Sequence, residues 1–208
     1  IMNNEKEQYI RIIDYKSSIK DIDLNEVKAG IKLQLLTYMN EMCKQESAEP
    51  AGAFYYNLIE PMVKASQNMS DEQIEEELRK QFKMRGLILA DVDIIRKMDK
   101  NLDTGSSNII PATINKDETL SKKASNISKQ QFEYLQKYTN KIIKQISEEI
   151  LSGNINIKPY YNTKNKKTPC EYCTYKSICQ FGNGICKKEY NYISNLEKEA
   201  ILEMMKEK

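Results

Sequence analysis

The sequence contains no histidine among its 208 residues. This absence excludes histidine-based triads, histidine zinc ligands and a histidine general base within the chain. Carboxylates, lysine, tyrosine and cysteine remain to carry any chemistry. The chain also lacks a glycine-rich phosphate loop, so any ATP-driven activity is expected to belong to another domain or subunit.

Long apolar runs are also missing. No stretch approaches the roughly 20 apolar residues that a membrane-spanning helix needs, and the first residues, IMNNEKEQY, lack the basic and then apolar layout of a secretory leader. With 40% apolar and 30% charged residues, the composition predicts one globular domain, or a domain with an appendage, in a reducing cytoplasm. The five cysteines are therefore interpreted as thiols or metal ligands rather than as disulfides.

Charge is distributed unevenly along the chain. Residues 1–104 carry 15 Lys and Arg against 19 Asp and Glu, whereas residues 105–208 carry 17 lysines against 11 acids, which gives net charges of −4 and +6. Between Lys158 and Lys188 there are seven lysines and one acid, Glu171. Clustered cations suggest a polyanionic partner, although a run of solvated lysines is the commoner explanation of a single patch.

Hydrophobic periodicity and capping signals predict an α/β fold. Residues 101–127, rich in Asn, Ser, Thr and Gly, are expected to form a loop with a possible hairpin. The predicted strands cover 9–16, 51–59 and a short run from Gly86; the predicted helices cover 24–45, 71–79, a short piece after Gly86, 128–151 and 195–208. The apolar stripe of the first helix would consist of Val27, Ile31, Leu35, Tyr38 and Met42.

An acid and a lysine stand two apart near the end of the first predicted strand, in YIRIIDYKSS. Because side chains alternate between the faces of a strand, Asp14 and Lys16 should project from one face. A carboxylate can hold Mg²⁺, and a neighbouring lysine can stabilise charge developing on a phosphate. The spacing alone is weak, since Glu26-Val27-Lys28 also satisfies it within a predicted helix.

A glutamine and a tyrosine follow on the first predicted helix. Gln34 and Tyr38 are four residues apart and therefore neighbours on one helical face. They would either contribute to a site with Asp14 and Lys16 or make ordinary structural hydrogen bonds.

Three cysteines lie within ten residues of one another near the end of the chain. Cys170, Cys173 and Cys179 form a C-x2-C-x5-C pattern, and Cys186 lies seven residues further on. Such spacing indicates metal binding, and both zinc and iron–sulfur clusters accept four thiolates. Cys43 stands apart on the first predicted helix, where a small buried apolar role is expected.

Aromatic residues alternate with lysines around these cysteines. Lysines can neutralise backbone phosphates while aromatic rings stack on unpaired bases, a combination suited to single-stranded DNA. The alternative is that the rings pack around a metal site and the lysines are solvated. The aromatic residues concerned are Tyr160, Tyr161, Tyr172, Tyr175 and Phe181.

Together, IIDYKSS and GIKLQLLTYMNEM resemble the RecB-type nucleases of the PD-(D/E)xK superfamily, which combine a D-x-K strand with a Q-x-x-x-Y helix. The later layout, with PAGAFYYNLIEP, GLILAD, ILSGNINIKPY and the cysteine group, is similar to the nuclease domains of the AddB family of ATP-dependent helicase/deoxyribonuclease subunits. The resemblance spans residues 9 to about 185. It implies a restriction-endonuclease-like α/β core over 1–157, with an insertion at about 60–127, and a cysteine-bearing segment over 158–208.

The resemblance implies a Mg²⁺-dependent DNA exonuclease of 5′ to 3′ polarity. It would work in double-strand break repair and recombination with an AddA-type helicase-nuclease subunit as partner. Asp14 would bind Mg²⁺, the carbonyl of Tyr15 would be a further ligand, and Lys16 would be the catalytic lysine. Gln34 and Tyr38 would help to position the DNA and the active-site groups.

This sequence departs from the family in two respects. The family places another metal-binding Asp in a G-x-x-D-R-x-D segment before the D-x-K strand, and it completes a [4Fe–4S] cluster with a fourth cysteine far upstream of the other three. Neither is present in these 208 residues, although Cys186 could substitute as the fourth cluster ligand. We therefore expect the chain by itself to cleave DNA poorly or not at all.

Two other interpretations remain open. The chain could be a non-catalytic DNA-binding module built around a zinc or iron–sulfur site. It could also be a CRISPR-associated nuclease of the same superfamily, although the insertion at about 60–127 argues against these compact chains.

Overall fold

The computed structural model describes residues 1–3, 7–58, 69–121, 125–181 and 190–206. They belong to two compact units, one comprising Ile1–Ile22 and Leu33–Gln136, the other Asp23–Lys32 and Lys137–Lys208. The boundary between a 1–157 core and a 158–208 segment stays a prediction. Within the described ranges, no helix has both the length and the apolar character that crossing a bilayer requires.

The first unit contains a five-stranded mixed sheet with the order β1-β2-β3-β4-β7. β2 runs parallel to β3, and β4 runs parallel to β7, whereas the β1–β2 and β3–β4 pairs are antiparallel. The predicted α/β class is confirmed, and the three predicted strands are present. The strands are β1 (Met2–Asn3), β2 (Gln8–Lys16), β3 (Glu49–Asn57), β4 (Arg85–Leu89) and β7 (Asn126–Ile127).

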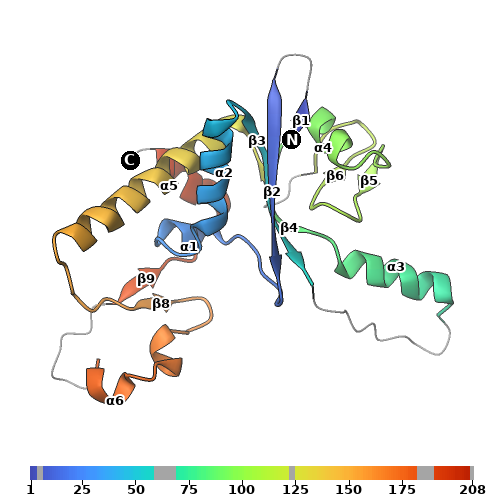
Figure 1. The fold of residues 1–208 in the computed structure, drawn as a ribbon. Helices are drawn as coiled ribbons and strands as arrows, with labels where there is room; N and C mark the ends of the chain where they lie inside the picture. Colours follow the sequence, from blue (N-terminus) through green and yellow to red (C-terminus); the bar gives the residue numbers. More distant parts are fainter. Residues whose placement is uncertain (4–6, 59–68, 122–124, 182–189, 207–208) are drawn as a thin grey trace. The chain divides into compact units, whose positions relative to one another are not determined.

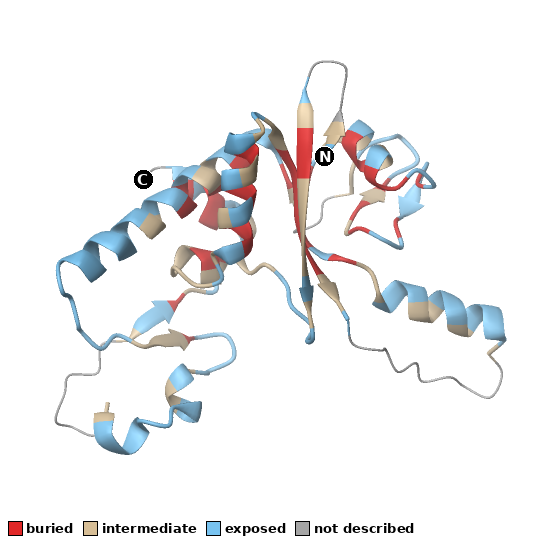
Figure 2. Ribbon diagram, in the orientation of Figure 1, coloured by how far each residue is buried: buried red, intermediate tan, exposed pale blue. Residues whose placement is uncertain are grey.

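The two faces of this sheet are covered by different elements of the first unit (Figure 1). The helix α2 (Gln34–Gln45) packs against β2 and β3 on one face. On the other face lie α4 (Val92–Met98) and the hairpin of β5 (Gly105–Ser106) and β6 (Thr113–Ile114). The central strands carry the red, buried part of the molecule in Figure 2, because they have neighbours on both faces.

Cys43 lies on the packed face of α2 and is 6% exposed. Burial raises the pKa of its thiol to about 11. At neutral pH this cysteine is therefore a protonated, small apolar group in the core, as its position in the sequence predicted.

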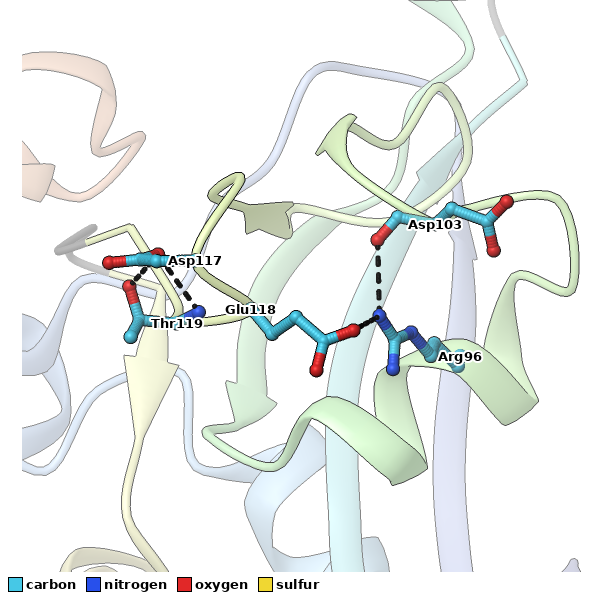
Figure 3. Close-up of polar contacts among 5 residues, drawn as sticks. All are labelled: Arg96, Asp103, Asp117, Glu118 and Thr119. Atoms are coloured by element: carbon cyan, nitrogen blue, oxygen red, sulfur yellow. Dashed lines mark hydrogen bonds and ion pairs between the residues drawn. The ribbon is translucent and has the colours of Figure 1, made fainter.

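The segment after α4 is held by side-chain contacts rather than by long strands (Figure 3). The Arg96 guanidinium forms an ion pair with Glu118 at 3.0 Å and donates to the Asp103 carbonyl at 3.4 Å. The Thr119 hydroxyl donates to Asp117 at 2.7 Å, and this hydrogen bond is the main cause that lowers the pKa of that carboxyl group. The hairpin expected within 101–127 is present as β5 and β6.

Two further helices begin where capping residues predict. α3 (Asp71–Gln81) starts after Ser70, whose hydroxyl accepts from the Gln73 amide while Gln73 accepts from the Ser70 amide. α5 (Lys129–Leu151) starts after Ser128 with the same reciprocal pair to Gln131. Reciprocal bonds of this kind satisfy two otherwise unpaired amides and fix the first turn.

The prediction of one helix over 24–45 is wrong. The chain instead forms α1 (Leu24–Lys28), breaks, and resumes as α2. Gly30 has a φ of +80° and Lys32 a φ of +57°, both in the left-handed region that ends a right-handed helix. The break also changes which side chains are buried: Tyr38 is 51% exposed, and the buried stripe of α2 consists of Leu35, Leu36, Met39, Asn40 and Cys43.

The second unit surrounds α1. The Asn25 side chain accepts from the Leu196 amide at 2.9 Å and from the Ser194 hydroxyl at 3.0 Å, while the Tyr138 hydroxyl donates to the Lys28 carbonyl. The terminal helix begins later than predicted, at Lys198. Besides α1 and most of α5, the unit contains β8 (Tyr160–Asn162), η1 (Pro169–Tyr172), α6 (Lys176–Cys179), β9 (Asn191–Ile193) and α7 (Lys198–Lys206).

Candidate active site

The end of β2 places an acid and a lysine together. Asp14 and Lys16 leave the same face of the strand, and the Lys16 ammonium nitrogen lies 2.8 Å from Asp14 Oδ2. Their side chains are 24% and 32% exposed, so the pair is open to a ligand without being fully solvated. The run of Ile12 and Ile13 before them fixes this part of the chain as a strand.

Asp14 Oδ2 is buried and makes no well-directed hydrogen bond with any described residue. The Lys16 ammonium is close to it, but this contact is an ion pair rather than an aligned hydrogen bond. A buried carboxylate oxygen without such a partner is costly unless a cation or donor joins it. The site therefore fits a hard divalent cation, which prefers oxygen ligands.

Lys16 has a pKa raised above its ordinary value, chiefly because of its contact with Asp14. Smaller contributions come from Tyr55 and Tyr38, and partial desolvation opposes them. The lysine is therefore an ammonium ion at neutral pH. It can stabilise negative charge on a substrate, but it cannot act as a general base there.

α2 brings the glutamine and the tyrosine to the same part of the unit. Gln34 Nε2 donates to the Tyr38 hydroxyl at 2.9 Å, and both side chains are exposed rather than buried in the helix core. Tyr38 is also close enough to Lys16 to influence its pKa. The structure thus brings Asp14, Lys16, Gln34 and Tyr38 to one face of the sheet, while the role of each stays a prediction.

Tyr15 lies differently. Its side chain leaves the opposite face of β2, is 60% exposed, and meets the Tyr56 ring edge-on at 5.8 Å between centroids. Only its backbone could take part in the site, so the carbonyl of Tyr15 as a metal ligand stays a prediction.

Sequence reasoning missed two neighbours of this pair. Tyr55 stands beside Asp14 in the β2–β3 register, with its ring centroid 5.8 Å from the Lys16 nitrogen, and Arg85 stands beside Tyr55 in the β3–β4 register. Their alignment depends on which strands pair and in what register. The only local signal was the position of each residue in a predicted strand.

The cysteine segment belongs to the second unit. Cys173 is exposed, and Cys170 and Cys179 are partly buried. Across the described part of the chain, no three Cys, Asp or Glu side chains are gathered closely enough to hold a metal ion. Cys186 lies outside the described residues. As a donor set, three thiols within ten residues still suit a soft metal centre that draws its fourth ligand from elsewhere.

The aromatic residues of this segment divide into two groups. The rings of Tyr161, Phe181 and Tyr190 pack together, with Phe181 and Tyr190 centroids 5.0 Å apart and Tyr161 and Tyr190 centroids 5.4 Å apart. Tyr172 and Tyr175 are 80% and 69% exposed. Packing therefore accounts for the first group, and only the second is available to stack on a base.

Residues 1–180 match the PD-(D/E)XK nuclease superfamily. The chain belongs to this superfamily. The match covers the D-x-K strand, the Q-x-x-x-Y helix and the first three cysteines of the terminal group, and the mixed sheet agrees with a restriction-endonuclease-like fold. Nucleases of this superfamily typically use divalent metals such as Mg²⁺, which agrees with the oxygen chemistry at Asp14.

Several bacterial relatives carry the name of an ATP-dependent helicase/deoxyribonuclease subunit, AddB. The protein of Thermoanaerobacter sp. (strain X514) is 40% identical over 210 residues, which cover 99% of this chain and 18% of that protein. The Caldanaerobacter subterraneus subsp. tengcongensis protein is 40% identical over 204 residues, and that of Bacillus thuringiensis (strain Al Hakam) is 39% identical over 212 residues, covering 96% and 98% of this chain. The chain thus spans about 18% of the length of these relatives.

Proposed function

We propose that this chain is the nuclease domain of an ATP-dependent helicase/deoxyribonuclease subunit and hydrolyses DNA phosphodiesters with Mg²⁺. The observation that carries the proposal is the Asp14 and Lys16 pair, in which a buried carboxylate oxygen lacks an aligned hydrogen bond beside an ammonium ion. The relatives' name and the superfamily support it. The whole protein would work in the cytoplasm as an exonuclease in double-strand break repair and recombination, paired with an AddA-type subunit.

In this mechanism Asp14 holds the divalent cation and positions it against the scissile phosphate. The bound cation polarises that phosphate and lowers the pKa of the attacking water. Lys16, which stays protonated, stabilises the charge that develops on the phosphate oxygens. The Tyr38 hydroxyl accepts from Gln34, so its own O–H proton remains available to donate to the DNA backbone.

One carboxylate is a weak site for Mg²⁺ on its own. Met2 pairs with Tyr9 in antiparallel order, so a segment that extended β1 backwards would run along β2 toward Asp14. We propose that a second carboxylate on such a segment completes the site. The 208-residue chain by itself would then cleave DNA weakly.

Cleavage and its polarity are measured with duplex DNA labelled at either the 5′ or the 3′ end. A longer polypeptide that includes the upstream segment should release labelled product in MgCl₂ and none in EDTA, with the 5′ label released first. The 208-residue chain should show a much lower rate. Tight DNA binding without Mg²⁺-dependent release by the longer polypeptide would instead support a non-catalytic DNA-binding module.

We further propose that Cys170, Cys173 and Cys179 hold three corners of a [4Fe–4S] cluster whose fourth ligand comes from outside the described residues. Protein purified without oxygen from cells that express the longer polypeptide should be brown and contain close to four irons per chain. Cys173→Ser should remove most of the iron, whereas Cys43→Ser should leave the iron content unchanged because Cys43 is a buried core thiol. Zinc in place of iron would contradict the cluster assignment.

A further inference from the structure

Three residues form a row across the sheet at the level of the site. Asp14 of β2 stands beside Tyr55 of β3, and Tyr55 stands opposite Arg85 of β4. Residues aligned in register project from the same face of a sheet. Neighbouring strands are about 4.8 Å apart, so the Arg85 backbone lies about 10 Å from that of Asp14 on the face that carries the candidate site.

Arg85 also lines a pocket with a basic wall. The pocket has a volume of about 360 Å³, and its charged lining residues are Lys80, Lys83, Arg85 and one acid, Asp21. Lys80 is engaged by Glu76 and Glu77, and Lys83 donates to the Ser106 hydroxyl at 3.1 Å. The structure records no ion pair or hydrogen bond from the Arg85 guanidinium to another described residue.

An exposed guanidinium of this kind suits a phosphate. Its donors are arranged as a planar fork that binds two phosphate oxygens at once, and its charge does not depend on pH in the working range. Successive nucleotides of one strand in a duplex are spaced by about 3.4 Å along the helix axis. A distance of about 10 Å therefore corresponds to about three nucleotides.

We propose that Arg85, supported by Lys83, binds an internal backbone phosphate of the DNA strand about three nucleotides from the scissile phosphate. The inference rests on the proposed nuclease function, because the distance is measured from the Asp14 and Lys16 pair. The bound phosphate would set the direction in which the strand crosses the sheet, from Lys16 past Tyr55 to the Arg85 pocket. The strand would thus be held at two points, one at the metal and one at the pocket.

The decisive test maps single phosphates. In the longer polypeptide, each phosphate of a single-stranded oligonucleotide is replaced in turn by a neutral methylphosphonate, and binding is measured by fluorescence anisotropy in EDTA. One position about three nucleotides from the cleavage site should weaken binding several-fold in the parent protein. In Arg85→Gln the same replacement should have no further effect, because the partner of that phosphate is gone.

A charge-matched control separates this contact from general electrostatics. Arg79→Gln removes the same charge from an exposed arginine on α3 that pairs with Glu75 and does not line the pocket. Arg85→Gln should weaken DNA binding about tenfold and reduce the slope of log affinity against log salt by about 0.7. Arg79→Gln should change neither by a comparable amount. Equal effects of the two variants would overturn the proposal.

Kinetics distinguish this inference from the proposed function. Arg85→Gln should raise KM about tenfold with little change in kcat, because it removes a contact made in the ground state and the transition state alike. If Asp14→Asn abolishes cleavage but Arg85→Gln leaves KM unchanged, the nuclease assignment stands and the phosphate pocket is wrong. If Arg85→Gln weakens only oligonucleotides with a terminal 5′ phosphate, the internal assignment is wrong.

Discussion

Replacing Asp14 by asparagine should abolish Mg²⁺-dependent DNA cleavage, lowering kcat/KM by about 10³-fold or more. Asparagine keeps the shape and one acceptor oxygen but removes the negative charge that holds a divalent cation. Loss of metal assistance raises the barrier by several kcal/mol, and each 1.36 kcal/mol is a factor of about ten in rate. The measurement is the rate of release of end-labelled nucleotides by the longer polypeptide at saturating MgCl₂.

A matched change elsewhere shows whether the effect is local. Asp93→Asn makes the same replacement at an exposed acid in the first turn of α4, and its cleavage rate should stay within about twofold of the parent. In Asp14→Asn the pKa of Lys16 should fall back toward its ordinary value, since the contact with Asp14 is what raises it most. Lys16 would still be protonated at pH 7, so the loss of activity cannot be assigned to it. An Asp14→Asn rate within about threefold of the parent would contradict the mechanism.

Local signals were sufficient for most of the secondary structure. The reciprocal caps at Ser70 and Ser128 involve residues only three apart, so the sequence contains the whole of each contact. The period of two around Asp14 likewise determines that Lys16 lies on the same face. The predicted site pair depends only on these short spacings.

Features that depend on distant parts of the chain could not be predicted in this way. The helical pattern of Val27, Ile31 and Leu35 continues through the break between α1 and α2, because it persists when the backbone reverses locally at Gly30 and Lys32. The row from Asp14 to Arg85 requires a parallel pairing of β2 with β3 and an antiparallel pairing of β3 with β4. Strand order and register arise from packing of the whole sheet.

Replacing Gly86 by alanine should destabilise the first unit by about 3 kcal/mol. Gly86 has a φ of +140°, which L residues rarely adopt, and a Cβ at this position would lie 2.1 Å from the Ala53 carbonyl oxygen. That oxygen belongs to the backbone of β3, so relief of the clash would require the β3–β4 ladder to open. Backbone strain and overpacking each cost about 1–3 kcal/mol. Urea denaturation of the parent and the variant measures the difference.

Gly105→Ala is the matched control, because Gly105 also has a positive φ, of +92°, but a Cβ there would meet nothing within 4 Å. Its cost should be about 1 kcal/mol, which is the conformational part alone. The difference between the two variants then measures the close approach of β4 to β3. Arg85 precedes Gly86, so a shifted β4 should also move the guanidinium and raise KM for DNA under conditions in which Gly86→Ala remains folded. Equal destabilisation by the two alanines would show that the contact with Ala53 does not hold β4 in register.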